Sequence, residues 1–245
     1  MPVITLVRHG QASFGADDYD VLSSTGHEQA RVLGAWLAAQ GPETTPGVVL
    51  HGGLRRHRET WEGIAEGAGW TATAHVDPDW DEFDFHAVLA HHGALTGARL
   101  APDADRRAFQ AHFEQGTGHW IAHDPDATGE APYPEPFAGF VTRARRALES
   151  ARAQGTPSTD STGTASPGPA GPTLVVTSGG VIATLAAALL APDPDEPVAL
   201  GVLWDRLNTV VVNTSVTRIL IGQQGARLLT FNEHPHLPRE LLTYR

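Results

Sequence analysis

Two residues able to act on a phosphate, Arg8 and His9, directly follow a short apolar run at the start of the chain. A neutral imidazole is a nucleophile, and a guanidinium binds phosphate oxygens through paired hydrogen bonds. Residues 3–7 are β-branched and apolar, as in a strand buried on both faces. Because ligands of open α/β sheets bind beyond the carboxyl ends of such strands, we expect Arg8 and His9 to lie at an active edge.

Two further strand-to-helix turns carry groups suited to an anion. Residues 48–50 predict a second buried strand, and the helix expected to start near Leu54 has arginines in its first turns (Arg55, Arg56 and Arg58). Basic residues there oppose the helix dipole, which indicates a nearby anion. Residues 173–177 predict a third strand, followed by Ser178-Gly179-Gly180 and a helix over 181–190. Glycines let backbone N–H groups approach a bound anion, so this turn also predicts phosphate binding.

The remaining periodic segments complete an α/β pattern. Thr25-Gly26-His27-Glu28 is a capping box that opens a helix ending at Gly41. Another helix is expected over about 137–153, and two β-rich segments, 209–221 and 226–231, close the sheet.

The least regular parts are two insertions within one domain spanning residues 1–245. Periodicity weakens over approximately 83–136, which we assign to an inserted cap. Residues 154–172 are rich in Gly, Pro, Ser and Thr, and we expect them to form a flexible low-complexity insertion on the surface.

Composition excludes several classes of chemistry. The 245 residues contain no Cys and no Lys, which rules out disulfides, thiolate catalysis, Schiff bases and a Walker-type phosphate loop. The net charge of −11 argues against a nucleic-acid partner. With no apolar run long enough for a membrane span or a signal peptide, we expect a cytoplasmic protein with no membrane partner. The 13 histidines include no HExxH pattern, so no metal site is expected.

Five motifs, in order along the chain, resemble those of the histidine phosphatase superfamily. They occupy residues 6–10, 54–60, 82–85, 176–182 and 213–217. The resemblance implies a phosphoglycerate-mutase-like fold. This is a three-layer α/β sandwich with a mostly parallel central sheet, helices on both faces and an inserted cap. It also implies a histidine-type acid phosphatase that needs neither metal nor cofactor.

The resemblance implies a role for each matching residue. His9 is expected to take the phosphoryl group, Arg8 and Arg56 to clamp its oxygens, and Glu82 to be the general acid. The acidic neighbours of Glu82 compete for that last role (Asp79, Asp81 and Asp84). The residues expected to bind substrate are Gln11, Ser13, Ser178 and Gly179. The substrate is expected to be a small phosphorylated metabolite, its apolar or aromatic body meeting Trp80, Phe83 and Phe85.

Two positions depart from the family's usual pattern. The turn after the late strand usually carries a second histidine, and here it carries Ser178, while Gly15 stands where many relatives place an Asn. Losing one preorganised donor commonly costs about 100- to 1000-fold in rate, so weak activity stays open. The candidates to fill the gap are His51, His234 and His236. The sequence alone predicts that Ser178→His preserves or raises activity.

Three other functions stay open. The first is a catalytically weak or inactive phospholigand-binding member of the same fold. The second is a phosphoglycerate mutase, which is disfavoured because the cap offers mainly three arginines to a multiply anionic substrate (Arg99, Arg106 and Arg107). The third is a serine hydrolase using Ser178, Asp205 and His234 or His236, although Val176 breaks the Gly-x-Ser-x-Gly pattern. The oligomeric state is open too, a homodimer included.

Overall fold

Six strands form one sheet in the part of the chain that the computed structural model describes, which is residues 2–13, 20–101, 104–155, 171–191, 193 and 196–244. They are β1 (Val3–Arg8), β2 (Val48–His51), β3 (Ala74–Val76), β4 (Thr173–Thr177), β5 (Val216–Gly222) and β6 (Gly225–Glu233). Their spatial order is β3-β2-β4-β1-β5-β6. Strands β1 to β4 run parallel, and β5 and β6 are antiparallel to their neighbours.

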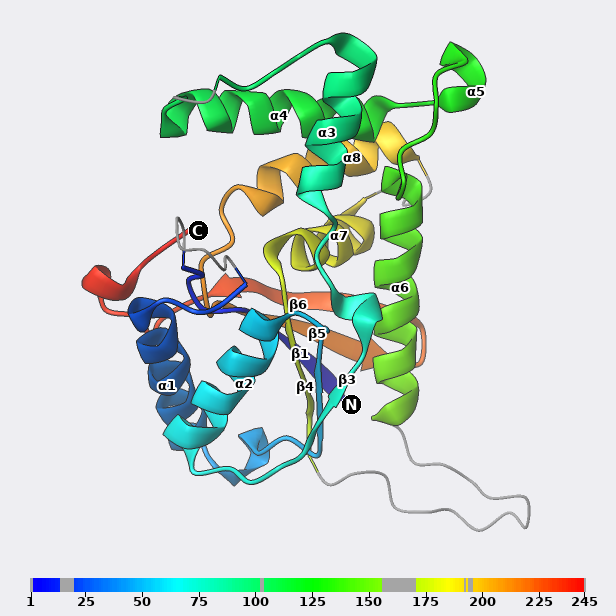
Figure 1. The fold of residues 1–245 in the computed structure, drawn as a ribbon. Helices are drawn as coiled ribbons and strands as arrows, with labels where there is room; N and C mark the ends of the chain where they lie inside the picture. The colour runs from blue at the N-terminus through cyan, green and yellow to red at the C-terminus, as the bar shows by residue number, and fades with distance from the viewer. Residues whose placement is uncertain are drawn as a thin grey trace.

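Helices cover both faces of this sheet (Figure 1). One face carries α1 (Ser24–Ala39) and α2 (Arg55–Ala68), and the other carries α6 (Phe137–Gln154) and α7 (Gly179–Leu190). Four further helices, drawn at the top of Figure 1, are α3 (Phe85–Thr96), α4 (Arg106–Ala122), α5 (Pro125–Thr128) and α8 (Pro197–Asn208). The predicted fold class, a mostly parallel α/β sandwich with helices on both faces, is thereby confirmed.

Alternation along the buried strands explains why the sheet has two cores. On β1, Val7 packs in the cluster that contains Leu33 of α1 and Ile64 of α2. Its neighbour Leu6 points to the opposite face and joins the cluster that contains Ile182 of α7. Successive side chains of a strand face opposite sides, so an unbroken apolar strand needs a helical layer on each face.

Several elements differ from the sequence prediction. The N-cap of helix α1 is Ser23, two residues before the expected cap Thr25, and its side chain accepts from the N–H of Gly26. Strand β3 and helix α8 were not predicted. Strand β3 has only three residues and an exposed His-Val pair, so it carries almost no apolar signal.

The strand expected over residues 209–221 begins only at Val216. Thr214 has a φ of 56°, which is incompatible with an extended strand. Its N–H donates to the carbonyl of Arg8 (3.0 Å), and the Asn213 side chain donates to the carbonyl of His9 (3.1 Å). The segment before β5 therefore crosses the end of β1 and fixes the backbone of the Arg8-His9 turn.

Two features singled out in the sequence, Gly15 and most of the insertion over 154–172, lie outside the described residues.

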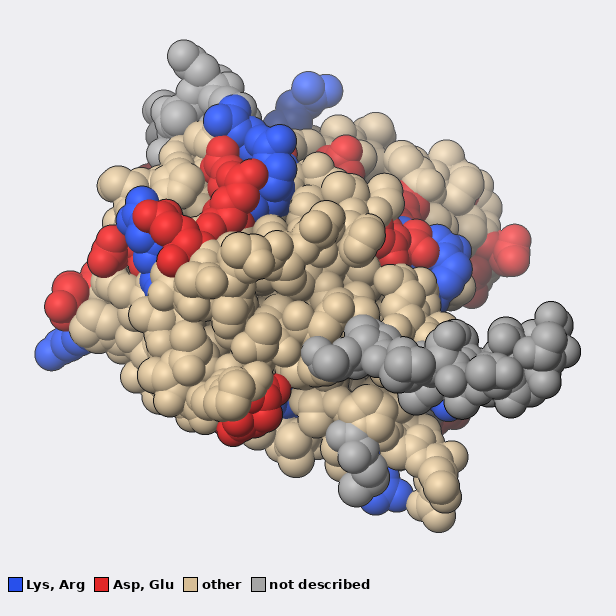
Figure 2. Space-filling view, turned by 90° about the horizontal axis from the view of Figure 1, so that it is seen from below, with Lys and Arg blue, Asp and Glu red and all other residues tan. Residues whose placement is uncertain are grey.

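The side of the molecule seen from below is largely uncharged at its centre, and its basic atoms lie mostly beside acidic ones (Figure 2). None of the described helices combines the length and apolarity that a membrane span requires.

Candidate active site

A cavity of about 220 Å³ lies where the carboxyl ends of β1 and β4 meet the cap. Its polar lining consists mainly of Arg8, His9, Arg56 and Glu82. Its apolar lining consists of Phe83, Phe85, Phe109 and Phe113, with Tyr244 at the side. A larger hollow of about 600 Å³ lies between Pro2, Arg152 and the β5–β6 turn, but it holds no nucleophile beside an acid. The residues able to act on a phosphate therefore lie in the first cavity.

His9 stands immediately after β1, held by hydrogen bonds along the sheet. Its N–H donates to the carbonyl of Thr177 at the end of β4 (2.9 Å), and its side chain is only 6% exposed. The ring atom Nδ1 lies 2.7 Å from the carbonyl of Gly10, to which an Nδ1–H donates. This tautomer leaves the lone pair of Nε2 unprotonated.

Burial, followed by the charges of Arg56 and Arg8, holds the pKa of His9 well below its usual value. Desolvation and neighbouring cations both disfavour an imidazolium. His9 is therefore neutral near pH 7, the form in which it can attack phosphorus.

Two guanidinium groups flank His9, and each is fixed from behind. Arg8 Nη1 donates to the carbonyls of Val211 and Tyr244, the latter at 2.9 Å. Arg56, in the first turn of α2, forms an ion pair with Asp20 at 2.7 Å and is 9% exposed. Groups fixed in this way stabilise negative charge without first having to reorganise.

Glu82 is the member of the acidic run 77–84 that lines the cavity. Its carboxylate accepts from the N–H of Gly180 (3.0 Å) and of Phe83 (3.2 Å). A Cβ at Gly180 would collide with this carboxylate, so glycine is needed there. Phe83 anchors the loop by stacking on Trp120, with ring centroids 4.8 Å apart. Burial raises the pKa of Glu82, which favours the protonated form that a general acid requires.

The competing carboxylates have other partners. Asp79 bonds to Arg146, and this hydrogen bond lowers the pKa of Asp79. Asp84 is the N-cap of α3, accepting from the N–H of Ala87. Burial raises the pKa of Asp81, but its carboxylate accepts from the backbone of Gly53 and lies beside α2.

Several residues expected to bind substrate lie away from the cavity lining. The side chain of Gln11 accepts from Ser23 Oγ (3.0 Å), and the backbone N–H of Ser13 donates to the carbonyl of Val21 (2.8 Å). Trp80 is 0% exposed and belongs to the core, so the expectation that it meets the substrate is wrong. Gly179 does line the cavity, whereas its neighbour Ser178 is fully buried and does not line it.

His57, in the first turn of α2, was not among the site residues predicted from the sequence. Its Nε2 lies 2.7 Å from Ser178 Oγ, and its ring centroid is 5.7 Å from that of His9. Burial, followed by the charge of Arg56, holds the pKa of His57 well below its usual value. A signal was present, because His57, Thr60, Trp61 and Ile64 have the spacing of one buried helical face.

The histidines proposed to fill the gap at Ser178 have other partners. His51 Nδ1 lies 2.7 Å from the carbonyl of Gly52 and His234 Nδ1 lies 2.6 Å from that of Asn232, while His236 faces Thr214. The serine hydrolase arrangement is not assembled either, because Ser178 contacts His57 and Asp205 is exposed on α8. Across the described residues, no group of three or more His, Asp or Glu side chains is placed to hold a metal ion.

Comparison with known proteins agrees with this geometry. The model of the histidine phosphatase superfamily (branch 1) matches residues 4–234. No match to a curated protein sequence was found.

Solved structures share the fold at low sequence identity. Mycobacterial glucosyl-3-phosphoglycerate phosphatase in complex with VO3 is 21% identical, with a TM-score of 0.61, covering 96% of this chain and 100% of that one. Phosphoserine phosphatase from Entamoeba histolytica, a mutant in complex with phosphoserine, is 18% identical (TM-score 0.57, covering 97% and 100%). Phosphoglycerate mutase from Bacillus anthracis is 18% identical (TM-score 0.60, covering 96% and 95%).

Proposed function

Because the chain belongs to branch 1 of the histidine phosphatase superfamily, we propose that it hydrolyses small phosphomonoesters through a phosphohistidine on His9. The observation that carries this proposal is the placement of a neutral imidazole between two guanidinium groups and a carboxyl group with a raised pKa, all in one cavity. The names of the structural relatives, two phosphatases and a mutase, fit the same class of chemistry.

In the first step His9 attacks the phosphorus atom. The Nε2–P bond forms as the bond from phosphorus to the ester oxygen breaks, in line with the attack. Arg8 and Arg56 bind the phosphoryl oxygens and stabilise the negative charge spread over them. Glu82 gives its proton to the leaving alkoxide and becomes a carboxylate.

In the second step water hydrolyses the phosphohistidine. The Glu82 carboxylate takes a proton from the attacking water as the new P–O bond forms and the N–P bond breaks. Inorganic phosphate leaves, and His9 and Glu82 return to their starting protonation states. This route uses no metal and no cofactor.

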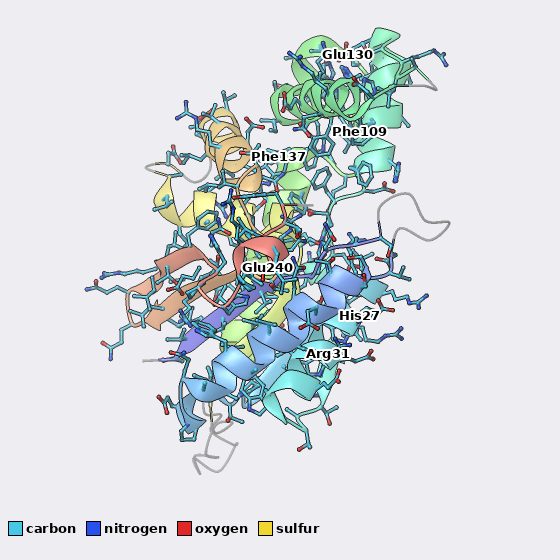
Figure 3. The ribbon with its side chains drawn as sticks, turned by 90° about the vertical axis from the view of Figure 1, so that its left-hand side faces the viewer. His27, Arg31, Phe109, Glu130, Phe137 and Glu240 are labelled. Carbon is cyan, nitrogen blue, oxygen red and sulfur yellow. The ribbon has the colours of Figure 1, made fainter. Side chains whose placement is uncertain are left out.

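The shape of the cavity points to the class of alcohol. Phenylalanine rings from the loop before α3, from α3 and from α4 surround a space of about 220 Å³ (Phe83, Phe85, Phe109 and Phe113). Phe109 lies on the inner side of the cap in Figure 3. Such a space suits a compact ester with an apolar or aromatic body. The mutase alternative is weaker, because Arg99 and Arg107 are exposed and do not line the cavity.

Trapping the intermediate tests the proposal. The protein is incubated with a panel of ³²P-labelled phosphomonoesters, including an aryl and an alkyl ester, quenched in alkali and digested. Label should appear on the peptide that contains His9, and His9→Ala should lose both label and hydrolysis. Phosphate binding without any hydrolysis would favour the non-catalytic binding protein, and phosphate exchange between phosphoglycerates would favour the mutase.

A further inference from the structure

The imidazole of His57 lies within the active-site wall although it does not line the cavity. His57 is 0% exposed, and α2 places it one residue after Arg56. Its ring is tilted 37° from that of His9, with 5.7 Å between centroids. Burial and the charge of Arg56, which also act on His9, lower the pKa of this imidazole.

The hydroxyl of Ser178 connects His57 to the phosphate site. Ser178 is the N-cap of α7, a position where serine usually accepts from the helix backbone, yet its side chain makes no such bond. Glu82 takes the N–H of Gly180 instead, and Ser178 Oγ lies 2.7 Å from His57 Nε2. When the proton of the neutral His57 imidazole is on Nε2, the Ser178 hydroxyl accepts it and still has its own O–H to donate.

Ser178 lies beside the reacting centre. Arg8 and Thr177 are paired in register on adjacent parallel strands, so the residues that follow them, His9 and Ser178, lie side by side. The next residue, Gly179, lines the cavity. The helix α7 that begins here also has its positive end toward an anion in the cavity.

The far side of the His57 ring is held in a fitted space. Its Nδ1 atom is buried without a well-formed hydrogen bond and lies 3.9 Å from Asp81 Oδ1, which is likewise buried without one. A Cβ at Gly52 would collide with both atoms. The sequence thus leaves room for this ring by using glycine at position 52.

We propose that His57 and Ser178 act as one unit, in which the His57 imidazole orients the Ser178 hydroxyl as a hydrogen-bond donor to the phosphoryl group on His9. Ser178 is then a catalytic residue, because it touches the reacting group, and His57 is a positioning residue. The inference rests on the proposed function. It explains how a site with serine at position 178 retains an imidazole close to His9.

A cycle of four variants tests this unit, with p-nitrophenyl phosphate as the substrate. His57→Ala and Ser178→Ala should each lower kcat by about 100-fold, since each removes the oriented donor. The double variant should be no worse than the poorer single variant, because both changes disable the same unit. Ser178→His alone should also lose activity, since its ring would meet that of His57, and this revises the prediction from sequence.

The exchange variant His57→Ala/Ser178→His separates this role from a merely structural one. It removes one imidazole and supplies another at the neighbouring position, so kcat should recover to within about tenfold of the wild type. His92→Ala is the matched control, because it deletes a buried imidazole of the cap that does not line the cavity. Its kcat should stay at the wild-type value.

Three results would overturn the unit. They are full kcat in Ser178→Ala or in folded His57→Ala, single losses that multiply in the double variant, and an exchange variant no faster than His57→Ala. If His57→Ala does not fold, Ser178→Ala still decides, because it removes only one oxygen. Failure of the proposed function is visible separately, as a wild-type protein that forms no phosphohistidine and releases no phosphate.

Discussion

The structure contains two groups of histidines whose surroundings differ. At the edge of the sheet, His9, His51 and His57 each have one ring nitrogen directed at a backbone carbonyl or a hydroxyl, and His9 and His57 have arginines nearby. In the cap, the rings of His92 and His119 are 5.0 Å apart and those of His119 and His123 are 5.6 Å apart. His119 there contacts the Tyr133 hydroxyl and His123 contacts Glu130, which lies at the outer end of the cap in Figure 3.

The difference shows that the number of histidines does not identify a reactive one. With His91 and His112, the cap group has five imidazoles against three at the sheet edge, but among the described residues none of its ring contacts and ion pairs involves an arginine. His9 has one nitrogen fixed, the other unprotonated, and a cavity with two guanidinium groups in front of it. These conditions, taken together, make an imidazole a phosphoryl acceptor.

The largest effect expected from this contrast is the loss of the nucleophile. His9→Ala should lower kcat by at least about 10⁴-fold, because it removes the nitrogen that forms the covalent intermediate. His119→Ala, in the cap group, should change kcat by less than about threefold. Steady-state hydrolysis of p-nitrophenyl phosphate measures both. Comparable losses in the two variants would contradict the distinction between the groups.

The sequence was sufficient to place the cavity residues that come at the ends of strands. It was insufficient to place those that tertiary contacts position. Arg8, His9 and Gly179 could be placed because an apolar run before them marks a buried strand, and strand ends converge. His57 could not be placed, because its role depends on the distance between α2 and the turn after β4. Gln11 was misplaced because its bond to Ser23 joins two turns that no periodic pattern relates.

The next largest effect concerns Glu82, whose carboxyl group lies in the segment between strand β3 and the cap helix α3. Glu82→Gln should lower kcat by about 100- to 1000-fold for alkyl phosphates, whose leaving group needs a proton. The loss should be smaller for p-nitrophenyl phosphate, because nitrophenolate leaves without one. Asp79→Asn is the matched control, since Asp79 pairs with Arg146 outside the cavity. Equal losses for both esters would argue against proton donation by Glu82.

A smaller effect is expected where the cap meets the cavity. Phe113 packs near Phe83 and Phe85, with centroids 6.4 and 6.2 Å away, and lines the space assigned to the alcohol. Phe113→Ala should raise KM for aryl phosphates by about tenfold, the equivalent of losing part of one aromatic contact. Ethyl phosphate, too small to reach this ring, should keep its KM. An unchanged KM for the aryl ester would remove the cap from substrate recognition.

The smallest expected effect concerns His236, a histidine whose pKa is lowered mainly by burial and not by neighbouring arginines. Burial, followed by the charge of His234, lowers the pKa of His236 to about 4. An unfolded histidine titrates near 6.5, so between pH 6.5 and 4 the unfolded chain binds a proton that folded His236 does not. The free energy of unfolding should therefore fall as pH drops through this window, with His236 contributing about 1.4 kcal/mol per pH unit.

Urea unfolding at pH 7, 6 and 5 measures the slope of the free energy of unfolding against pH. This slope should be smaller by that amount in His236→Gln. His75→Gln, at an exposed position of β3, should keep the wild-type slope. If His236→Gln keeps the wild-type slope too, burial does not hold the His236 imidazole neutral.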